Sequence, residues 1–126
     1  MREILFRGKR RLGNEWIEGS LHTEKFTDDE EYLCCEINQC DVYPETVGQY
    51  TGLTDKNGSK IFEGDIRRHY GNYSGKNIYA PVVFELGMFY LKYDEKAGMP
   101  LGDMCERVEV IGNIHDNPGL LKGGEG

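Results

Sequence analysis

The stretch that organises this chain reads VGQYTGLTDKNGSKIFEGDI and covers residues 47–66. Glycines punctuate it at four places, Gly48, Gly52, Gly58 and Gly64. Its centre, Lys56-Asn57-Gly58-Ser59, is typical of a hairpin, because Asn-Gly accepts the positive φ of a type I′ turn. Gly64 and the residues after it then begin a further strand. The stretch therefore predicts paired strands joined by tight turns.

Apolar residues alternate with polar ones on both sides of this stretch, which is the period of a β-strand. Strands are expected around Ile4–Phe6, Ile17–Leu21, Ile78–Phe84, Phe89–Tyr93 and Val108–Ile114. Pro81 interrupts one of them and indicates an edge position or a bulge, because proline cannot donate to a central ladder. Residues 68–77 and 96–103 are expected to be loops, and a short helical piece is expected either near Gly119 or in the acidic segment described below.

The fold class that follows is mainly β, as a small barrel or a strongly bent antiparallel sheet built from hairpins. No long, well-capped helical period and no internal repeat is visible in the 126 residues. A chain of this length buries roughly two-thirds of its unfolded surface, so one domain over residues 1–126 needs no metal or disulfide to fold. The glycine-rich tail, residues 122–126, is expected to be mobile.

The net charge of −7 comes from one segment, residues 24–45, which holds eight acidic residues and one basic residue. In the rest of the chain the two signs balance. We interpret this segment as an acidic insertion, a solvated loop that ends at Tyr43-Pro44-Glu45. Because phosphate neutralisation supplies most nucleic-acid affinity, an acidic chain is not favoured as a general nucleic-acid binder.

Several classes of protein are excluded by composition. No apolar stretch approaches the ~20 residues of a membrane helix, and the N-terminus lacks the apolar core of an export signal. We therefore expect a cytoplasmic protein without a membrane partner. Such a chain keeps its thiols reduced, so its cysteines are interpreted as small buried or incidental residues (Cys34, Cys35, Cys40, Cys105). No zinc or calcium spacing is present, so no cofactor is predicted.

Two basic clusters are candidates for a local binding surface. The first contains Arg2, Arg7, Lys9, Arg10 and Arg11. The second lies in residues 67–76, where bases and aromatics mix, and loops of that kind can stack bases and hold phosphates. The candidate binding residues there are Arg67, Arg68, His69, Tyr70, Tyr73 and Lys76. A solvated loop that only packs its tyrosines is the competing interpretation.

One pair of carboxylates could act in catalysis. Glu63 and Asp65 are two residues apart, and on a strand such neighbours share a face. The competing interpretation is that Asp65 accepts backbone N–H bonds and holds a turn closed. No nucleophile elbow or triad pattern is present, so no catalytic residue is assigned.

The 47–58 and 61–66 segments resemble the central signature of the YopX family of phage and prophage proteins. Residues 2–7 resemble the start of that family, and residues 108–118 with Leu120 and Leu121 resemble its end. The signature residues are Gly48, Gly52, Asp55, Asn57, Gly58, Glu63, Gly64, Asp65, Gly112 and Asn113. The resemblance implies a mainly β fold, a phage or prophage origin and a place in the cytoplasm of a bacterial host. It implies no activity.

The leading hypothesis is a non-enzymatic phage accessory protein that binds an unknown phage or host macromolecule or assembles with itself. A homo-oligomer is expected because exposed edge strands can pair between chains. The alternative is a nucleic-acid-binding module that uses the loop 67–76. A hydrolase using Glu63 and Asp65 is the third hypothesis.

Overall fold

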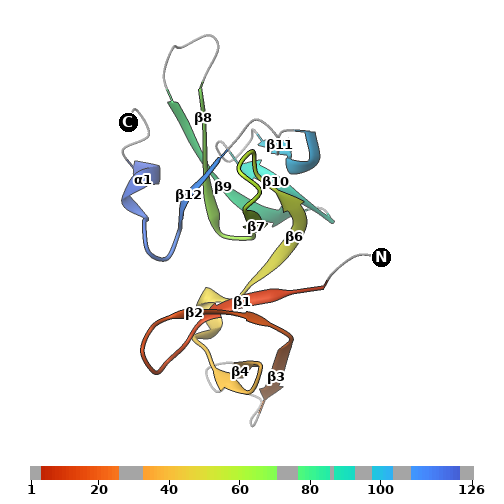
Figure 1. Cartoon of the computed structure of the whole chain (residues 1–126), viewed down its shortest axis with the longest axis vertical. Helices are drawn as coiled ribbons and strands as arrows, with labels where there is room; N and C mark the ends of the chain where they lie inside the picture. Colours follow the sequence, from red (N-terminus) through yellow and green to blue (C-terminus); the bar gives the residue numbers. More distant parts are fainter. Residues whose placement is uncertain are drawn as a thin grey trace. The chain divides into compact units, whose positions relative to one another are not determined.

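The computed structural model describes residues 4–25, 33–70, 77–85, 87–92, 98–103 and 109–122 (Figure 1). Almost all of its regular structure is strand, so the mainly β class is confirmed. The chain divides into two compact units, residues 1–50 and residues 51–126. The described strands form three antiparallel sheets, and a small barrel is not confirmed by their order.

Unit 1 is built from two short ribbons, β1–β2 and β3–β4–β5. Its elements are β1 (Phe6–Lys9), β2 (Trp16–Gly19), β3 (Leu21–Lys25), β4 (Leu33–Ile37), β5 (Cys40–Asp41), the 3-10 helix η2 (Pro44–Thr46) and the start of β6 (Gly48–Thr54). An isolated bridge between Arg10 and Val42 joins the two ribbons. The predicted N-terminal hairpin is confirmed, since β1 pairs antiparallel with β2.

The sequence suggested a solvated loop for the acidic segment, but its described part contains the end of β3, then β4, β5 and η2, and supplies the core of unit 1. Cys35, Ile37 and Val42 are buried there, and Phe6 and Ile17 pack against them. Glu36 lies between Cys35 and Ile37 in β4, so its side chain is on the face opposite the buried one. The central part of this segment, residues 26–32, lies outside the described residues.

Unit 2 centres on a five-stranded antiparallel sheet with the order β11-β10-β9-β8-β12. Its elements are the rest of β6, β7 (Lys60–Phe62), β8 (Asp65–Tyr70), β9 (Asn77–Glu85), β10 (Met88–Lys92), β11 (Gly98–Pro100), the 3-10 helix η3 (Leu101–Asp103), β12 (Glu109–Asn113) and α1 (Gly119–Lys122). The helical piece near Gly119 is confirmed. The expected loops are shorter than predicted, because β8 and β9 enter residues 68–77 and β11 and η3 enter residues 96–103.

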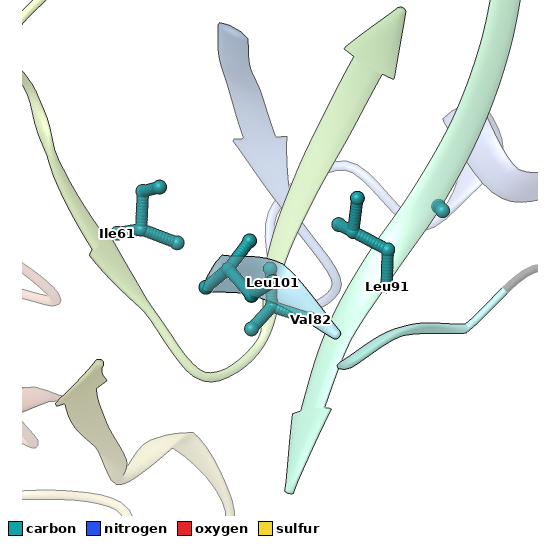
Figure 2. Packing of buried hydrophobic residues seen from close by; sticks show 5 residues of the cluster. Ile61, Val82, Leu91 and Leu101 are labelled. Carbon is teal, nitrogen blue, oxygen red and sulfur yellow. The ribbon is translucent and has the colours of Figure 1, made fainter. Parts of the chain in front are cut away.

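The core of unit 2 gathers five buried residues from the four elements β7, β9, β10 and η3 (Figure 2). They are Ile61, Ala80, Val82, Leu91 and Leu101. Leu53 and Val110 pack against this cluster. The alternation of β9 and β10 therefore sends one face of each strand into the core, as period-two patterning requires.

Pro81 does not mark an edge strand, because β9 lies between β8 and β10. Pairing of β9 with β8 ends at Pro81, and pairing with β10 begins at Val82. The missing N–H of proline thus falls where the strand changes partners, so a central strand tolerates it.

The β6–β7 hairpin exists, but its turn is not type I′. Among its turn residues only Gly58 has a positive φ, +83°, and the Gly58 N–H donates to the Asp55 carbonyl at 3.0 Å. A type I′ geometry occurs instead between β4 and β5, where Asn38 and Gln39 have φ of +51° and +68°. Asn38 reaches αL at low cost because its short polar side chain bonds locally.

Candidate functional site

The strongest candidate surface lies on β1 and β2 of unit 1. Alternation along β1 directs Arg7 and Lys9 to one side of the strand, and the register sets Lys9 directly opposite Trp16. The Arg7 guanidinium carbon is 4.9 Å from the centroid of the Trp16 ring, and Lys9 Nζ is 5.8 Å from it. Both are cation–π distances.

The same surface continues where β1 meets the chain after β5. The Tyr43 N–H donates to the Lys9 carbonyl at 2.9 Å, and the Arg11 N–H donates to the Asp41 carbonyl at 3.1 Å. This pairing brings the Arg11 guanidinium carbon to 4.9 Å from the centroid of the Tyr43 ring. We call the set Arg7, Lys9, Arg11, Trp16 and Tyr43 the basic–aromatic face.

The opposite side of β1 holds this face in place. Gly8 is buried, and a Cβ there would lie 3.1 Å from both Ile37 Cδ1 and Val42 Cβ. The backbone of β1 therefore packs directly on the core of unit 1, and a Cβ at position 8 would require Ile37 and Val42 to shift by a few tenths of an ångström. Because Arg7 and Lys9 flank Gly8, their side chains lie on the side of β1 that faces away from this core. Both residues are half-buried, and Nε and Nη2 of Arg7 are buried.

The sequence contains a signal for this face in the alternation of β1 and the position of its hairpin turn. Arg7 and Lys9 alternate with Phe6 and Gly8, and the hairpin turn at 11–14 implies that Trp16 lies across from Lys9. The basic cluster was noted, but the binding site was assigned to residues 67–76 because aromatics are adjacent to bases there. Pairing between strands, not adjacency in sequence, brings Trp16 to the basic residues.

Of the predicted binding residues of 67–76, the four that the structure describes lie in strand β8. Arg67 lies in β8 with 0% of its surface exposed. Arg68 is partly exposed and forms an ion pair with Glu109 of β12. His69 and Tyr70 are strand residues of β8, while Tyr73 and Lys76 lie outside the described residues.

Several signature residues meet around Asp55, which is 6% exposed. Its Oδ1 accepts the backbone N–H groups of Asn57 and Ser59, each at 2.9 Å. Its Oδ2 accepts the Val110 N–H at 2.9 Å, 55 residues further along the chain. Burial alone would raise the pKa of Asp55, but these three donors and the positive charge of Arg67 together lower it. Asp55 therefore holds β12 against the β6–β7 turn.

Asn57 and Glu109 extend this contact on the surface. Asn57 Nδ2 donates to Glu109 Oε2 at 3.2 Å, and Arg68 donates to the other carboxylate oxygen. The bond from Arg68, followed by the bond from Asn57, lowers the pKa of Glu109. Arg68 thus forms an ion pair within unit 2.

The remaining signature residues lie in two places. One group surrounds the turn between β7 and β8 and its partner strand β12, and the other residues lie in β6. Phe62 donates its N–H to Asp65 Oδ2 at 2.7 Å across the turn at Glu63 and Gly64. Asn113 pairs with Asp65 in the β8–β12 register. A Cβ on Gly112 would lie 2.5 Å from the Asn117 side chain. Gly48 and Gly52 belong to β6, where Gly52 has a φ of +86°.

Comparison with known families assigns the chain. The family described as "YopX protein" matches residues 5–122, which span both units. The chain belongs to the YopX family. The predicted resemblance to the YopX family is therefore confirmed.

A solved structure is similar to this YopX-family chain. The crystal structure of protein EF1440 from Enterococcus faecalis matches it with a TM-score of 0.61 and 24% identity. The match covers 96% of this chain and 99% of the other. At this identity the match shows a shared fold alone. No curated protein matches the chain.

The catalytic interpretation of Glu63 and Asp65 loses its geometric basis in this YopX-family fold. Glu63 lies in the turn before β8, so the two residues do not share one strand. Asp65 is 1% exposed and accepts a backbone N–H. A buried carboxylate that already closes a turn, the role expected from its position, is poorly placed to meet a substrate.

The described part of the chain shows neither a cluster of metal ligands nor a membrane-spanning helix. Its residues contain no group of three or more His, Cys, Asp and Glu side chains arranged to hold a metal ion. Cys35 is buried, and Cys34 and Cys40 are partly buried, all three as free thiols; Cys105 lies outside the described residues. Across the described ranges, the helices are too short and polar to cross a membrane.

Proposed function

We propose that this YopX-family chain is a non-enzymatic accessory protein of a phage or prophage that acts in the cytoplasm of the bacterial host. Its activity is binding, and its ligand is single-stranded nucleic acid held on the basic–aromatic face. The observation that supports this is a pair of half-buried rings with cations beside them: Lys9 and Arg7 lie beside Trp16, and Arg11 lies beside Tyr43.

The chemistry of the face matches an unpaired polynucleotide. Successive bases stack on aromatic side chains, and nearby Lys and Arg neutralise phosphates. Stacking on Trp16 or Tyr43 requires bases that are not already stacked in a duplex. The ammonium group of Lys9 beside Trp16 and the guanidinium of Arg11 beside Tyr43 would neutralise phosphates next to the stacked bases.

The loop that was first assigned this role is a weaker candidate. Arg67 is buried, and Arg68 is already bonded to Glu109, so neither offers its charge to a ligand without loss of internal contacts. The net charge of −7 further restricts binding to a local patch. Binding should therefore be modest in affinity and strongly dependent on salt.

A fluorescence titration tests the proposal directly, because Trp16 is the sole tryptophan of the chain. A stacked base should quench Trp16 emission as a single-stranded oligonucleotide is added at low salt. Exchanging Lys9 and Arg11 together for alanine should lower the salt slope, log K against log salt, by about 1.4, since each lost phosphate contact removes about 0.7.

The matched control exchanges two lysines of unit 2, Lys56 and Lys92, for alanine. It removes the same charge and should leave the affinity for a labelled oligonucleotide close to that of the parent. Trp16→Ala should weaken binding by about 1–3 kcal/mol, the usual contribution of one stacked base. Absence of binding to the parent protein at low salt would refute the proposal.

A further inference from the structure

A surface hollow of about 410 Å³ lies on unit 1, where β3 and β4 meet the turn that follows β4. It is lined by Ser20, Leu21, His22, Glu36, Asn38 and Gln39. Its volume is that of a small-molecule site, and its lining combines an apolar side chain with groups that form hydrogen bonds. None of these residues belongs to the basic–aromatic face, so the hollow is a separate feature of the molecule.

Asn38 forms a fixed rim of the hollow. Its Nδ2 donates to the Glu18 carbonyl at 3.0 Å, and its Oδ1 accepts the Ser20 N–H at 3.3 Å. The Asn38 N–H donates to the Ser20 carbonyl, also at 3.3 Å. A Cβ on Gly19 would lie 2.2 Å from Asn38 Oδ1, so the glycine leaves room for this amide. The rim therefore keeps its position without a ligand.

Gln39 occupies a backbone position that does not suit its side chain. Its φ is +68°, in the left-handed region. The second central position of a type I′ turn favours glycine, and a residue with a Cβ is disfavoured there. The turn alone thus gives no reason for glutamine. Strained backbone of this kind is found where a site requires a particular side chain, and Gln39 lines the hollow.

Glu36 and His22 are the ionisable residues of the hollow. They are directly opposed in the β3–β4 register, so their side chains project from the same side of the sheet. Glu36 is half-buried and His22 is exposed. Within the described ranges of the chain, neither side chain takes part in a hydrogen bond or an ion pair. Both oxygens of Glu36 are therefore available to a ligand, with an imidazole ring beside them.

These groups match the Watson–Crick edge of guanine. An ionised carboxylate only accepts hydrogen bonds, and its two oxygens suit two parallel N–H donors. Guanine presents two adjacent donors, N1–H and N2–H, with the O6 acceptor next to them. Adenine and cytosine present a ring acceptor at that place, and thymine sets its one N–H between two carbonyl oxygens. The Gln39 carboxamide can donate to O6, and the His22 ring can stack on the base.

The hollow adjoins the basic–aromatic face on the outward side of unit 1. Glu36 lies opposite Asp41, and the bond from the Arg11 N–H to the Asp41 carbonyl continues this row to the end of β1. Opposed residues project to the same side of a sheet, and Tyr43, two residues after Asp41, shares that side. Strand spacing and rise separate Glu36 from Tyr43 by about 8 Å, which two or three stacked nucleotides span.

We propose that the hollow binds a guanine base, with Glu36 accepting N1–H and N2–H and Gln39 donating to O6. The base belongs to the single strand that lies on the basic–aromatic face, so this inference rests on the nucleic-acid binding proposed above. The two surfaces divide the work. The cations neutralise phosphates whatever the sequence, whereas the hollow selects the base.

Single-base changes in a labelled oligonucleotide test this selection by fluorescence anisotropy at low salt. A thymidine oligonucleotide is compared with the same oligonucleotide carrying one central guanosine, inosine or adenosine. Guanosine should increase the affinity by about 5- to 150-fold, the discrimination of one bidentate base contact. Inosine lacks the 2-amino group and should lose most of this gain. Equal affinities for guanosine and thymidine would overturn the proposal, as would a gain with adenosine as large as that with guanosine.

Two variants assign the preference to the hollow. Glu36→Gln replaces an acceptor oxygen with a donor, so the ratio of guanosine to thymidine affinities should fall close to one. Gln39→Gly should also lower this ratio, yet it should raise the melting temperature because glycine relieves the left-handed backbone. Glu24→Gln, the matched control, removes a carboxylate of β3 outside the hollow and should keep the parent ratio. An unchanged ratio in Glu36→Gln, or a lower melting temperature in Gln39→Gly, would refute the assignment.

Free nucleotides separate this proposal from the one on which it rests. Guanosine monophosphate should shift the backbone amide signals of residues 20–22 and 36–39 in proton–nitrogen NMR spectra, whereas adenosine monophosphate at the same concentration should not. Such shifts without quenching of Trp16 by any oligonucleotide would refute nucleic-acid binding and leave a site for a free guanine nucleotide. Quenching with neither these shifts nor a guanosine preference would refute the guanine site alone.

Discussion

Replacement of Asp55 is expected to be among the most damaging single changes in unit 2. Asp55→Ala leaves three backbone N–H groups, those of Asn57, Ser59 and Val110, without their acceptor. Asn57 and Ser59 are exposed, so water can reach their N–H groups, whereas Val110 is half-buried. The Val110 bond therefore dominates the loss.

The magnitude follows from these three bonds. A hydrogen bond to a charged acceptor contributes about 1.5–3 kcal/mol, and an ordinary one about 0.5–1.5 kcal/mol. The bond from Val110 should contribute the higher value, and the bonds from the two exposed donors should each contribute close to the lower one. Asp55→Ala should therefore lower the free energy of unfolding by about 3–5 kcal/mol. Asp55→Asn keeps one acceptor oxygen and loses the charge facing Arg67, so it should cost about half as much.

The loss of stability caused by replacing Asp55 should become smaller as the pH is lowered. The pKa of Asp55 in the folded chain is lowered from its ordinary value of 3.8. A group with a depressed folded pKa stabilises the fold above its unfolded pKa and loses that contribution as pH falls through the folded pKa. The difference in stability between the parent and Asp55→Asn should therefore be full at neutral pH and shrink below about pH 4.

Urea denaturation followed by far-ultraviolet circular dichroism measures both effects. The matched control is Glu85→Ala, which removes a carboxylate of unit 2 that pairs with Lys92 at 2.8 Å on the surface. A surface pair contributes at most about 1 kcal/mol. If Asp55→Ala were no less stable than Glu85→Ala, the structural role of Asp55 would be refuted.

Three further outcomes are expected. Asp65→Ala should lower the melting temperature more than Asp65→Asn, because only the amide can still accept the Phe62 N–H; equal melts for Asp65→Ala and the parent would contradict this. Gly19→Ala should destabilise unit 1 by about 1–3 kcal/mol, since a Cβ there would lie 2.2 Å from the Asn38 side chain; adding Asn38→Gly should recover part of the loss, as denaturation of each variant would reveal. The purified protein should contain no stoichiometric zinc or calcium, and elemental analysis finding one metal per chain would overturn that prediction.

Much of the fold was predictable because its causes are local. Period-two alternation located most strands, and Gly58 marked a hairpin turn correctly even though the turn type was wrong. The error at the acidic segment was also local in origin. A run of carboxylates was given more weight than the alternation of Cys35 and Ile37 with charged neighbours, which marks a strand with one buried face.

The sites were less predictable because they depend on contacts between distant residues. The charge of Arg67 and the aromatics beside it suggested an exposed loop, yet neighbouring strands bury this residue. Lys9 acquires Trp16 as a neighbour only through hairpin register, and the basic–aromatic face did not appear as a motif in the chain.

The sequence by itself determined the strand-forming segments, the turn positions and membership of the YopX family, because each depends on residues close together in the chain. Only the tertiary structure decided that Val110 bonds to Asp55, that β9 lies in the middle of its sheet, and that Trp16 and Arg7 lie in contact. Pairing between distant strands is selected by how well their apolar faces pack in three dimensions, and the strand pattern alone leaves many pairings open.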